Sequence, residues 1–180
     1  MKYKQKLWWS ITSGYLALNY ATLGMMPSYW NRINELLSGN GLLFQYVLYA
    51  AIGVGLTLFL YGKGFFNQAK NVLVTLFFVV AFCVMFYLEK NPGEKIHMVQ
   101  YGIFGWLLFK ALALDCKNTS VHLYLTGGLI CLIAGALDEV IQGILPNRHF
   151  TWHDVFINGM SGIMVQLYMY FYLKHRVINA

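Results

Sequence analysis

The chain has 180 residues, of which 58% are hydrophobic and only 11% are charged, and its mean hydropathy is +0.53. Soluble domains carry roughly 25% charged residues, so this composition excludes a soluble enzyme, a disordered chain and a disulfide scaffold, and it predicts one membrane domain over residues 1–180. The net charge of +6 does not indicate a nucleic-acid partner, because the basic residues lie at the ends of apolar runs, as membrane anchors do.

Apolar runs long enough to cross a membrane set the expected architecture. A spanning helix needs about 20 mostly apolar residues, since the hydrocarbon core is about 30 Å thick. Such runs predict an all-α, polytopic membrane bundle of six helices: Leu7–Met26, Leu42–Tyr61, Val72–Leu88, Ile96–Leu114, Val121–Ile141 and Val155–Leu173. The third and sixth runs are the strongest, whereas the fourth and fifth are weakened by polar residues at their ends.

The first run and the basic residues predict the orientation. Lys2, Lys4 and Lys6 would suit a signal peptide, but the apolar stretch after them exceeds the roughly 7–15 residues of a signal peptide, so an uncleaved helix is expected. In a six-span arrangement, nine of the 13 Lys and Arg residues fall on the side of the N-terminus. Cytoplasmic loops are enriched in these residues, which predicts that both termini are cytoplasmic.

Polar residues recur at helical spacing near the outer ends of the last three runs. They are Glu94, His97 and Tyr101 in the fourth, Asp138, Glu139 and Gln142 in the fifth, and Asp154 and Asn158 in the sixth. The fourth and fifth runs should be antiparallel neighbours because residues 116–120 connect them tightly. Ionisable residues in spans usually face the bundle interior or a wet cavity. The pattern therefore predicts an outward-facing polar pocket between these three helices.

Some of these residues also have a structural interpretation. Glu94 and Asp154 stand near helix N-termini, where an acid caps the helix or is favoured by its dipole. Asp138 and Glu139 are harder to explain in this way, because they lie near a helix C-terminus, where the dipole disfavours negative charge. These two acids need a cation, a shared proton or a ligand.

Lys95 and Arg148 are the nearest cations along the sequence. Together with the four acids, and with His97 neutral, they give the cluster a net charge of −2. This balance favours an amine, a metal ion or a carboxyl group sharing a proton over a bare anion.

Enzyme motifs are incomplete. Residues 159–162 match the GxSG motif of rhomboid proteases, but the only later histidine, His175, lies in the predicted cytoplasmic tail. No HExxH occurs. His149 and His153 could join the acids of the fifth run around a metal, but two interfacial histidines are the simpler interpretation. No cofactor and no metal site is expected, and no catalytic residue is assigned.

The last three runs resemble VanZ-like membrane proteins over about residues 94–170. Residues 94–102, which include Lys95, His97 and Tyr101, look like the family's helix that opens with a basic residue, His and Tyr. The family's D-E-x-x-Q…P-x-R…D-x-x-x-N signature is matched by Asp138, Glu139, Gln142, Pro146, Arg148, Asp154 and Asn158.

One position departs from the family pattern. The family usually has Gly three residues after the Asn, where this chain has Ser161 followed by Gly162. Gly162 and the other glycines of the last two runs, Gly127, Gly128, Gly135 and Gly159, are expected to permit close helix packing.

The resemblance implies a small multi-pass protein of the bacterial cytoplasmic membrane. The family's named member is associated with resistance to the glycopeptide antibiotic teicoplanin. The resemblance also carries over Lys95, His97, Tyr101, Asp138, Glu139, Gln142, Arg148, Asp154 and Asn158 as signature residues.

Three functions remain open from the sequence. The first is a cell-envelope binding protein that recognises a lipid-linked headgroup or a glycopeptide-like ligand at the outer leaflet. In it, Asp138 and Glu139 would receive cationic or hydroxyl groups, Arg148 would pair an anionic group, and His97 would tune protonation. The second is an intramembrane hydrolase or transferase that uses His97 with Asp138 or Glu139, with or without a metal. The third is a purely structural bundle.

Overall fold

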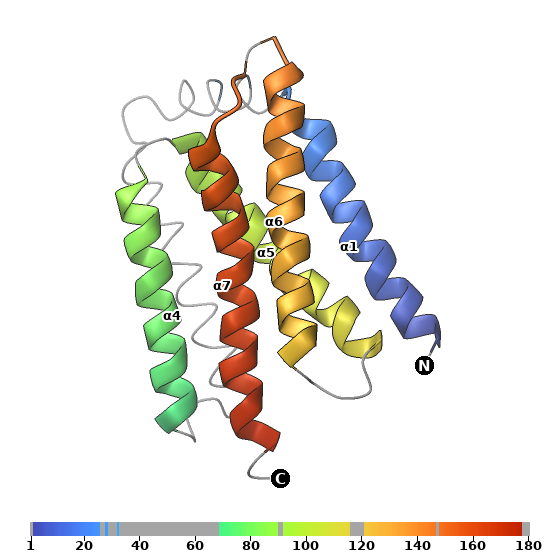
Figure 1. Cartoon of the computed structure of the whole chain (residues 1–180), viewed down its shortest axis with the longest axis vertical. Helices are drawn as coiled ribbons and strands as arrows, with labels where there is room; N and C mark the ends of the chain where they lie inside the picture. The colour runs from blue at the N-terminus through green and yellow to red at the C-terminus, as the bar shows by residue number, and fades with distance from the viewer. Residues whose placement is uncertain are drawn as a thin grey trace.

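The computed structural model describes residues 2–25, 69–89, 92–115, 121–146 and 148–177, together with residues 28 and 32. Every regular element in these ranges is an α-helix: α1 Lys2–Thr22, α4 Ala69–Leu88, α5 Pro92–Asp115, α6 Val121–Ile144 and α7 Trp152–Val177 (Figure 1). The all-α expectation is confirmed for these residues, and the run predicted at 42–61 lies outside them.

Three of the described helices are long and apolar enough to cross a membrane: α4, the Glu94–Asp115 part of α5, and α6. α1 and α7 do not qualify, so the expectation that the sixth run is among the strongest is wrong. The reason is that α7 carries Asn158, Ser161 and Gln166, whose polar side chains are buried within the bundle. Long apolar helices agree with a membrane protein.

The helices form an antiparallel bundle with α5 and α7 at its centre. α7 packs against α4, α5 and α6, and α5 also packs against α1 and α6. Figure 1 shows that α1 begins and α7 ends at one end of the bundle, whereas α5 begins, α6 ends and α7 begins at the other. The buried core comprises Tyr101, Phe104, Leu108, Phe109, Leu112, Leu123, Tyr124, Cys131 and Ala134.

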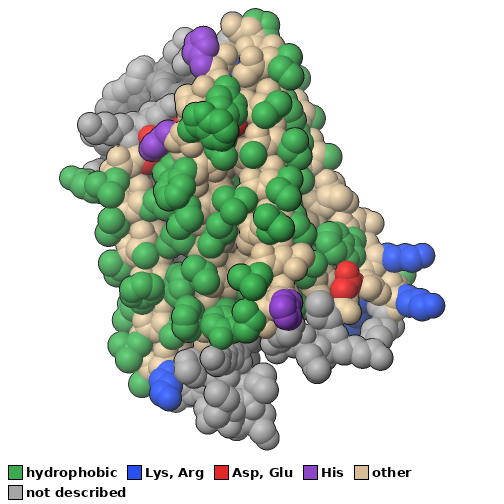
Figure 2. Space-filling model, viewed as in Figure 1, with side chains coloured by type: hydrophobic (Ala, Val, Ile, Leu, Met, Phe, Trp, Pro, Cys, Tyr) green, Lys and Arg blue, Asp and Glu red, His purple; other side chains and the backbone are tan. Residues whose placement is uncertain are grey.

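The outer surface of the bundle is also apolar. Leu73, Phe77 and Val80 of α4 are each more than half exposed, as is Leu129 of α6. Figure 2 shows apolar side chains along the middle of the viewed face, with the visible Lys and Arg side chains at the lower end. Soluble monomers rarely expose continuous apolar surfaces of this extent. The exposed residues are therefore suited to lipid contact.

Glycines set how closely α7 approaches its neighbours. A Cβ added to Gly105 of α5 would lie 2.8 Å from the carbonyl oxygen of Gly162, so the two backbones are in direct contact. A Cβ added to Gly162 would lie 2.6 Å from the Cys131 sulfur of α6. The close-packing expectation is confirmed for Gly162, whereas a Cβ at Gly128 would make only an ordinary contact, 3.5 Å from Ile163.

We expect Gly105→Ala to lower the free energy of unfolding by about 1–3 kcal/mol, because the added methyl group must displace the backbone of α7. Gly14→Ala in α1 is the matched control, since a Cβ there meets nothing within 4 Å. Alanine at Gly14 should be neutral or stabilise the helix by up to about 1 kcal/mol. Thermal or denaturant unfolding of both variants in one detergent measures the difference. Equal stability of the two variants would contradict a backbone contact between α5 and α7.

Candidate functional site

The start of α5, the end of α6 and the start of α7 lie at the same end of the bundle. Local backbone structure defines each of these three helix termini. α5 begins at Pro92, a residue suited to the first helical position. After α6, the Leu145 N–H donates to the Gln142 carbonyl at 3.0 Å. The Thr151 hydroxyl then accepts the Asp154 N–H at 3.1 Å, which caps the start of α7.

Asp138 is the point at which three helices connect. Its side chain is 1% exposed, and its Oδ2 accepts hydrogen bonds from Gln142 Nε2 at 3.3 Å and Asn158 Nδ2 at 3.2 Å. His97 Nδ1 of α5 lies 3.4 Å from the same oxygen. The sequence expectation that these residues share one depth is met in the structure, because α5, α6 and α7 each supply a partner.

Glu139 is fully buried and ties the start of α7 to the end of α6. Its Oε1 accepts a hydrogen bond from Gln142 Nε2 at 2.7 Å, and its Oε2 accepts one from the Thr151 N–H at 3.2 Å. In a capping box, that N–H would be bonded by the acid three residues later, which here is Asp154. Because Glu139 takes this N–H, the Asp154 carboxylate can turn towards α5.

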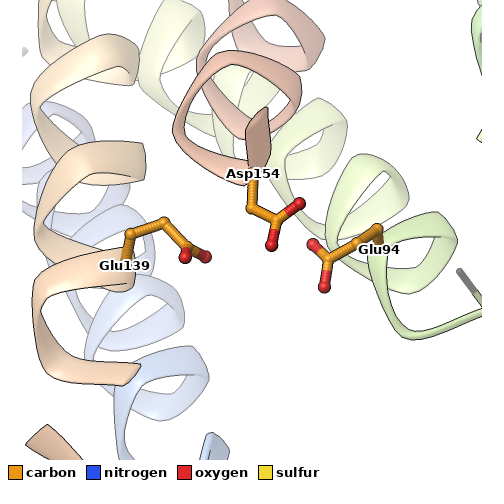
Figure 3. Close-up of side chains that lie close together, drawn as sticks. All are labelled: Glu94, Glu139 and Asp154. Carbon is orange, nitrogen blue, oxygen red and sulfur yellow. The ribbon is translucent and has the colours of Figure 1, made fainter. Parts of the chain in front are cut away.

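Three carboxylates converge in front of this junction. One oxygen from each of Glu94, Glu139 and Asp154 lies within 4.8 Å of the other two, and Figure 3 shows the three groups pointing towards one another from α5, α6 and α7. Two ionised carboxylates at this separation repel by about 3 kcal/mol at an effective dielectric constant near 20. The sequence predicted these three residues in one polar pocket but no metal site, because spacing along each helix gives no distance between oxygens on different helices.

Among the described residues, the Glu94 carboxylate lacks a hydrogen bond that a helix-capping acid would make. The residue is only 3% exposed, yet its Oε2 has no hydrogen-bond partner within the described part of the chain. The buried Oδ1 of Asn158 also lacks one there. Buried polar atoms normally have partners, so the site contains two unused acceptors.

The two cations expected to neutralise the acids behave differently. Lys95 Nζ lies 5.2 Å from the centroid of the Phe86 ring, and no ion pair joins it to the acids of the cluster among the described residues. Arg148 is half-buried and interacts electrostatically with Glu94, Asp138 and Glu139. Nevertheless, each ion-pair contact in the described ranges involves a histidine.

Direct neutralisation of the acids by Lys95 is therefore not seen among the described residues. Once Lys95 is removed from the count, the four acids face one guanidinium and have a formal excess of three negative charges when all are ionised. Glu89 adds another buried carboxyl group nearby, 3.7 Å from His153 Nε2. Its place beside the site was not recognised from the sequence.

Two tyrosines complete the inner wall of the site. Tyr101 donates a hydrogen bond from its hydroxyl to the Ala134 carbonyl at 3.0 Å, and Tyr20 of α1 donates to the same carbonyl at 2.8 Å. Both tyrosines also interact with Asp138. Tyr101 was expected at the site, whereas Tyr20 was missed because no local pattern relates α1 to the last three helices.

The remaining motif residues are explained by local structure. Ser161 is fully buried and its hydroxyl donates to the Ile157 carbonyl at 2.8 Å, one turn earlier in α7. This bond agrees with an accidental match to the rhomboid motif. His153 is 63% exposed and lies 3.1 Å from Asp154 Oδ1.

Two apolar grooves lie on the sides of the bundle. One, of about 410 Å³, runs between α6 and α7 and is lined by Leu125, Leu129, Leu132 and Ile163, among others. The second, of about 290 Å³, lies between α4 and α7. Neither groove is lined by the carboxylates, so the polar site is a separate feature at the end of the bundle.

Comparisons of the chain with models of known families, with curated proteins and with solved structures gave no match.

We expect Asp138→Ala and Asn158→Ala to be coupled by about 1–3 kcal/mol in a double-mutant cycle of unfolding in detergent, because each removes the other's buried partner. The control pair is Asp138→Ala with Gln166→Ala. Gln166 is equally buried on α7 but donates to the Gly105 carbonyl at 2.7 Å. This pair should be additive within about 0.5 kcal/mol. Additivity in both pairs would argue against a single connected site.

Proposed function

We propose that this chain is a multi-pass protein of the bacterial cytoplasmic membrane that binds a lipid-linked headgroup or a glycopeptide-like ligand. The ligand would bind at the outer ends of α5, α6 and α7. The observation that carries this proposal is the buried group of acceptors from three helices, in which Glu94 Oε2 and Asn158 Oδ1 have no described partner. A ligand with amine or hydroxyl groups would satisfy such acceptors.

Arg148 gives the proposed ligand a second recognition point. Its Nε is buried and has no hydrogen-bond partner within the described ranges, although the guanidinium acts electrostatically on the acids around it. An arginine pairs well with phosphate or carboxylate. A ligand that carries both a donor group and an anionic group, as lipid-linked headgroups do, would match this combination. The resemblance of residues 94–170 to VanZ-like proteins, whose named member is associated with teicoplanin resistance, adds a glycopeptide-like molecule to the candidate ligands.

We place the site on the outer side of the membrane and both termini in the cytoplasm. Lys2, Lys4 and Lys6 begin α1 at the end of the bundle opposite the carboxylates. Lys110 lies near that end too, with its Nζ 5.7 Å from the Trp106 ring centroid. This distribution supports the orientation, because basic residues favour the cytoplasmic side.

The groove between α6 and α7 supports a ligand with an acyl or prenyl chain. Its lining is apolar and reaches Leu132, which precedes Asp138 by six residues on the same helix. At 1.5 Å per residue, this spacing is about 9 Å along the helix axis. A lipid could therefore place its headgroup at the carboxylates and its chain along α6.

An intramembrane hydrolase is the second candidate, and the contact between His97 and Asp138 favours it. A carboxylate 3.4 Å from an imidazole nitrogen can orient that ring as a general base. The nucleophile would be water, since the Ser161 hydroxyl is bonded within its own helix. We rank this candidate second because Asp138 Oδ2 already accepts two amide hydrogen bonds from Gln142 and Asn158, which also explain its burial.

The proposed function predicts the behaviour of charge-removing variants in cells. Expression of the wild-type chain should reduce teicoplanin susceptibility, and Asp138→Asn combined with Glu139→Gln should return susceptibility to the empty-vector level. Asp115→Asn is the matched control, because this acid lies at the opposite end of α5 and accepts a hydrogen bond from Trp9. Membrane abundance and unfolding temperature must be compared alongside. A fully resistant double variant would reject the proposal.

The proposed topology makes a separate prediction. A reporter fused after Ala180 should give a cytoplasmic signal, whereas one inserted after Pro146, between α6 and α7, should give a periplasmic signal. Accessibility labelling of a cysteine introduced at Pro146 provides an independent readout. A periplasmic signal from the fusion after Ala180 would be incompatible with six spans and an inner N-terminus.

A further inference from the structure

We propose that Glu94, Glu139 and Asp154 hold a hard divalent cation, and that Ca²⁺ is the ion whose size they fit. The proposal rests on the proposed function, because it names the first component that the outer polar site would bind. Its direct evidence is the convergence of one oxygen from each residue, all within 4.8 Å of one another (Figure 3).

The spacing of these oxygens suits calcium coordination. Ca²⁺ binds oxygen ligands at about 2.3–2.6 Å, so two of its ligands can lie up to about 5 Å apart across the ion. Mg²⁺ binds at about 2.0–2.1 Å, which limits that separation to about 4.2 Å, and it demands a nearly ideal octahedron. An opposite pair of oxygens up to 4.8 Å apart is within the span of Ca²⁺ and beyond that of Mg²⁺, so the upper limit of the separations favours Ca²⁺. An all-oxygen set also favours these hard cations over zinc.

An unpaired oxygen provides evidence that does not depend on the clustering of acids. Glu94 is 3% exposed, its Oε2 has no hydrogen-bond partner among the described residues, and its carboxylate is directed towards Asp154 (Figure 3). Leaving such an atom without a partner is costly in a buried site. A bound cation would satisfy it, whereas a plain helix cap would bond it to backbone N–H groups.

The other contacts of the three acids leave room for this role. Glu139 holds Gln142 through one oxygen and the Thr151 N–H through the other, each of which fixes the carboxylate and still leaves lone pairs. Asp154 Oδ1 is next to His153, which is mostly exposed. Arg148 supplies one positive charge near four acids, and a divalent ion would remove most of the remaining excess.

A cation at this point would also explain how an acidic site could take an anionic headgroup. The ion would have open coordination positions, because three carboxylates fill only part of the six to eight ligands that Ca²⁺ takes. A phosphate oxygen of the ligand could occupy one of these positions, with Arg148 beside it. The acids would then bind the phosphate through the cation rather than repel it.

The test uses the full-length protein in detergent, after chelation, with Ca²⁺ itself as the probe. Titration calorimetry should give one Ca²⁺ per chain. If the dissociation constant lies in the 0.1–1 mM range of extracellular sites, about 10 mM Ca²⁺ should raise the unfolding temperature by about 3–10 °C. Mg²⁺ should act more weakly, and KCl of equal ionic strength should not reproduce the shift.

Variants assign the binding to these residues. Glu94→Gln and Asp154→Asn should each lower the Ca²⁺ affinity at least about tenfold, because each removes one charged ligand of three. Asp115→Asn, at the other end of α5, should bind Ca²⁺ as the wild type does. A wild-type protein that neither binds Ca²⁺ nor changes its unfolding temperature would overturn the inference, as would variants with unchanged affinity.

These outcomes separate the cation site from the proposed function. Stoichiometric Ca²⁺ binding combined with an unchanged antibiotic phenotype in Glu94→Gln cells would keep the cation site and count against the ligand proposal. Loss of the phenotype in Asp138→Asn/Glu139→Gln cells, without Ca²⁺ binding by the wild type, would do the reverse.

Discussion

The burial of several carboxyl groups in one place is the constraint on which the rest of this structure depends. Asp138 and Glu139 are at most 1% exposed near the C-terminus of α6, where the helix dipole opposes their charge. Their burial is tolerable only with partners at short range, because an uncompensated buried charge costs several kcal/mol. Amide donors, a backbone N–H, an imidazole and one guanidinium supply part of that compensation. The remaining uncompensated group is Glu94, whose Oε2 has no hydrogen-bond partner among the described residues.

The partners can reach Asp138 only because the helices lie very close together. Gly105 and Gly162 bring the backbones of α5 and α7 into contact, and Gly162 also admits Cys131 of α6. In a membrane, no hydrophobic force drives helices together. Small residues at such crossings contribute instead by allowing close van der Waals packing. The glycine contacts lie inside the bundle and the carboxylates at its end, so packing in one place determines hydrogen-bond geometry in the other.

Sequence periodicity predicted the last three helices and the residues around Asp138, because helical spacing places side chains on faces and the chain order makes α5, α6 and α7 neighbours. It could not predict contacts that depend on distant segments or on side-chain direction. Tyr20 reaches Ala134 from α1, across 114 positions. Lys95 lies over Phe86 instead of joining the acids. α7 was overrated as an apolar run, because Asn158, Ser161 and Gln166 lower its mean hydropathy. The pocket that holds the three carboxylates was predicted, but the close approach of their oxygens was not, because helical spacing gives no distances between side chains on different helices.

The hydrogen bond from the Thr151 N–H to Glu139 joins the end of α6 to the first turn of α7. The first turn of α7 takes its cap from its own Thr151 hydroxyl but shares its N-terminal amide with the preceding helix. This bond therefore couples the start of α7 to the end of α6. Without this bond, Glu139 would keep only its hydrogen bond with Gln142 among the described residues, and the Thr151 N–H would be available to the carboxylate of Asp154. Because Glu139 and Asp154 are two of the three converging carboxylates, the geometry of that group depends on this bond, whereas the hydrogen bonds of Asp138 do not involve it.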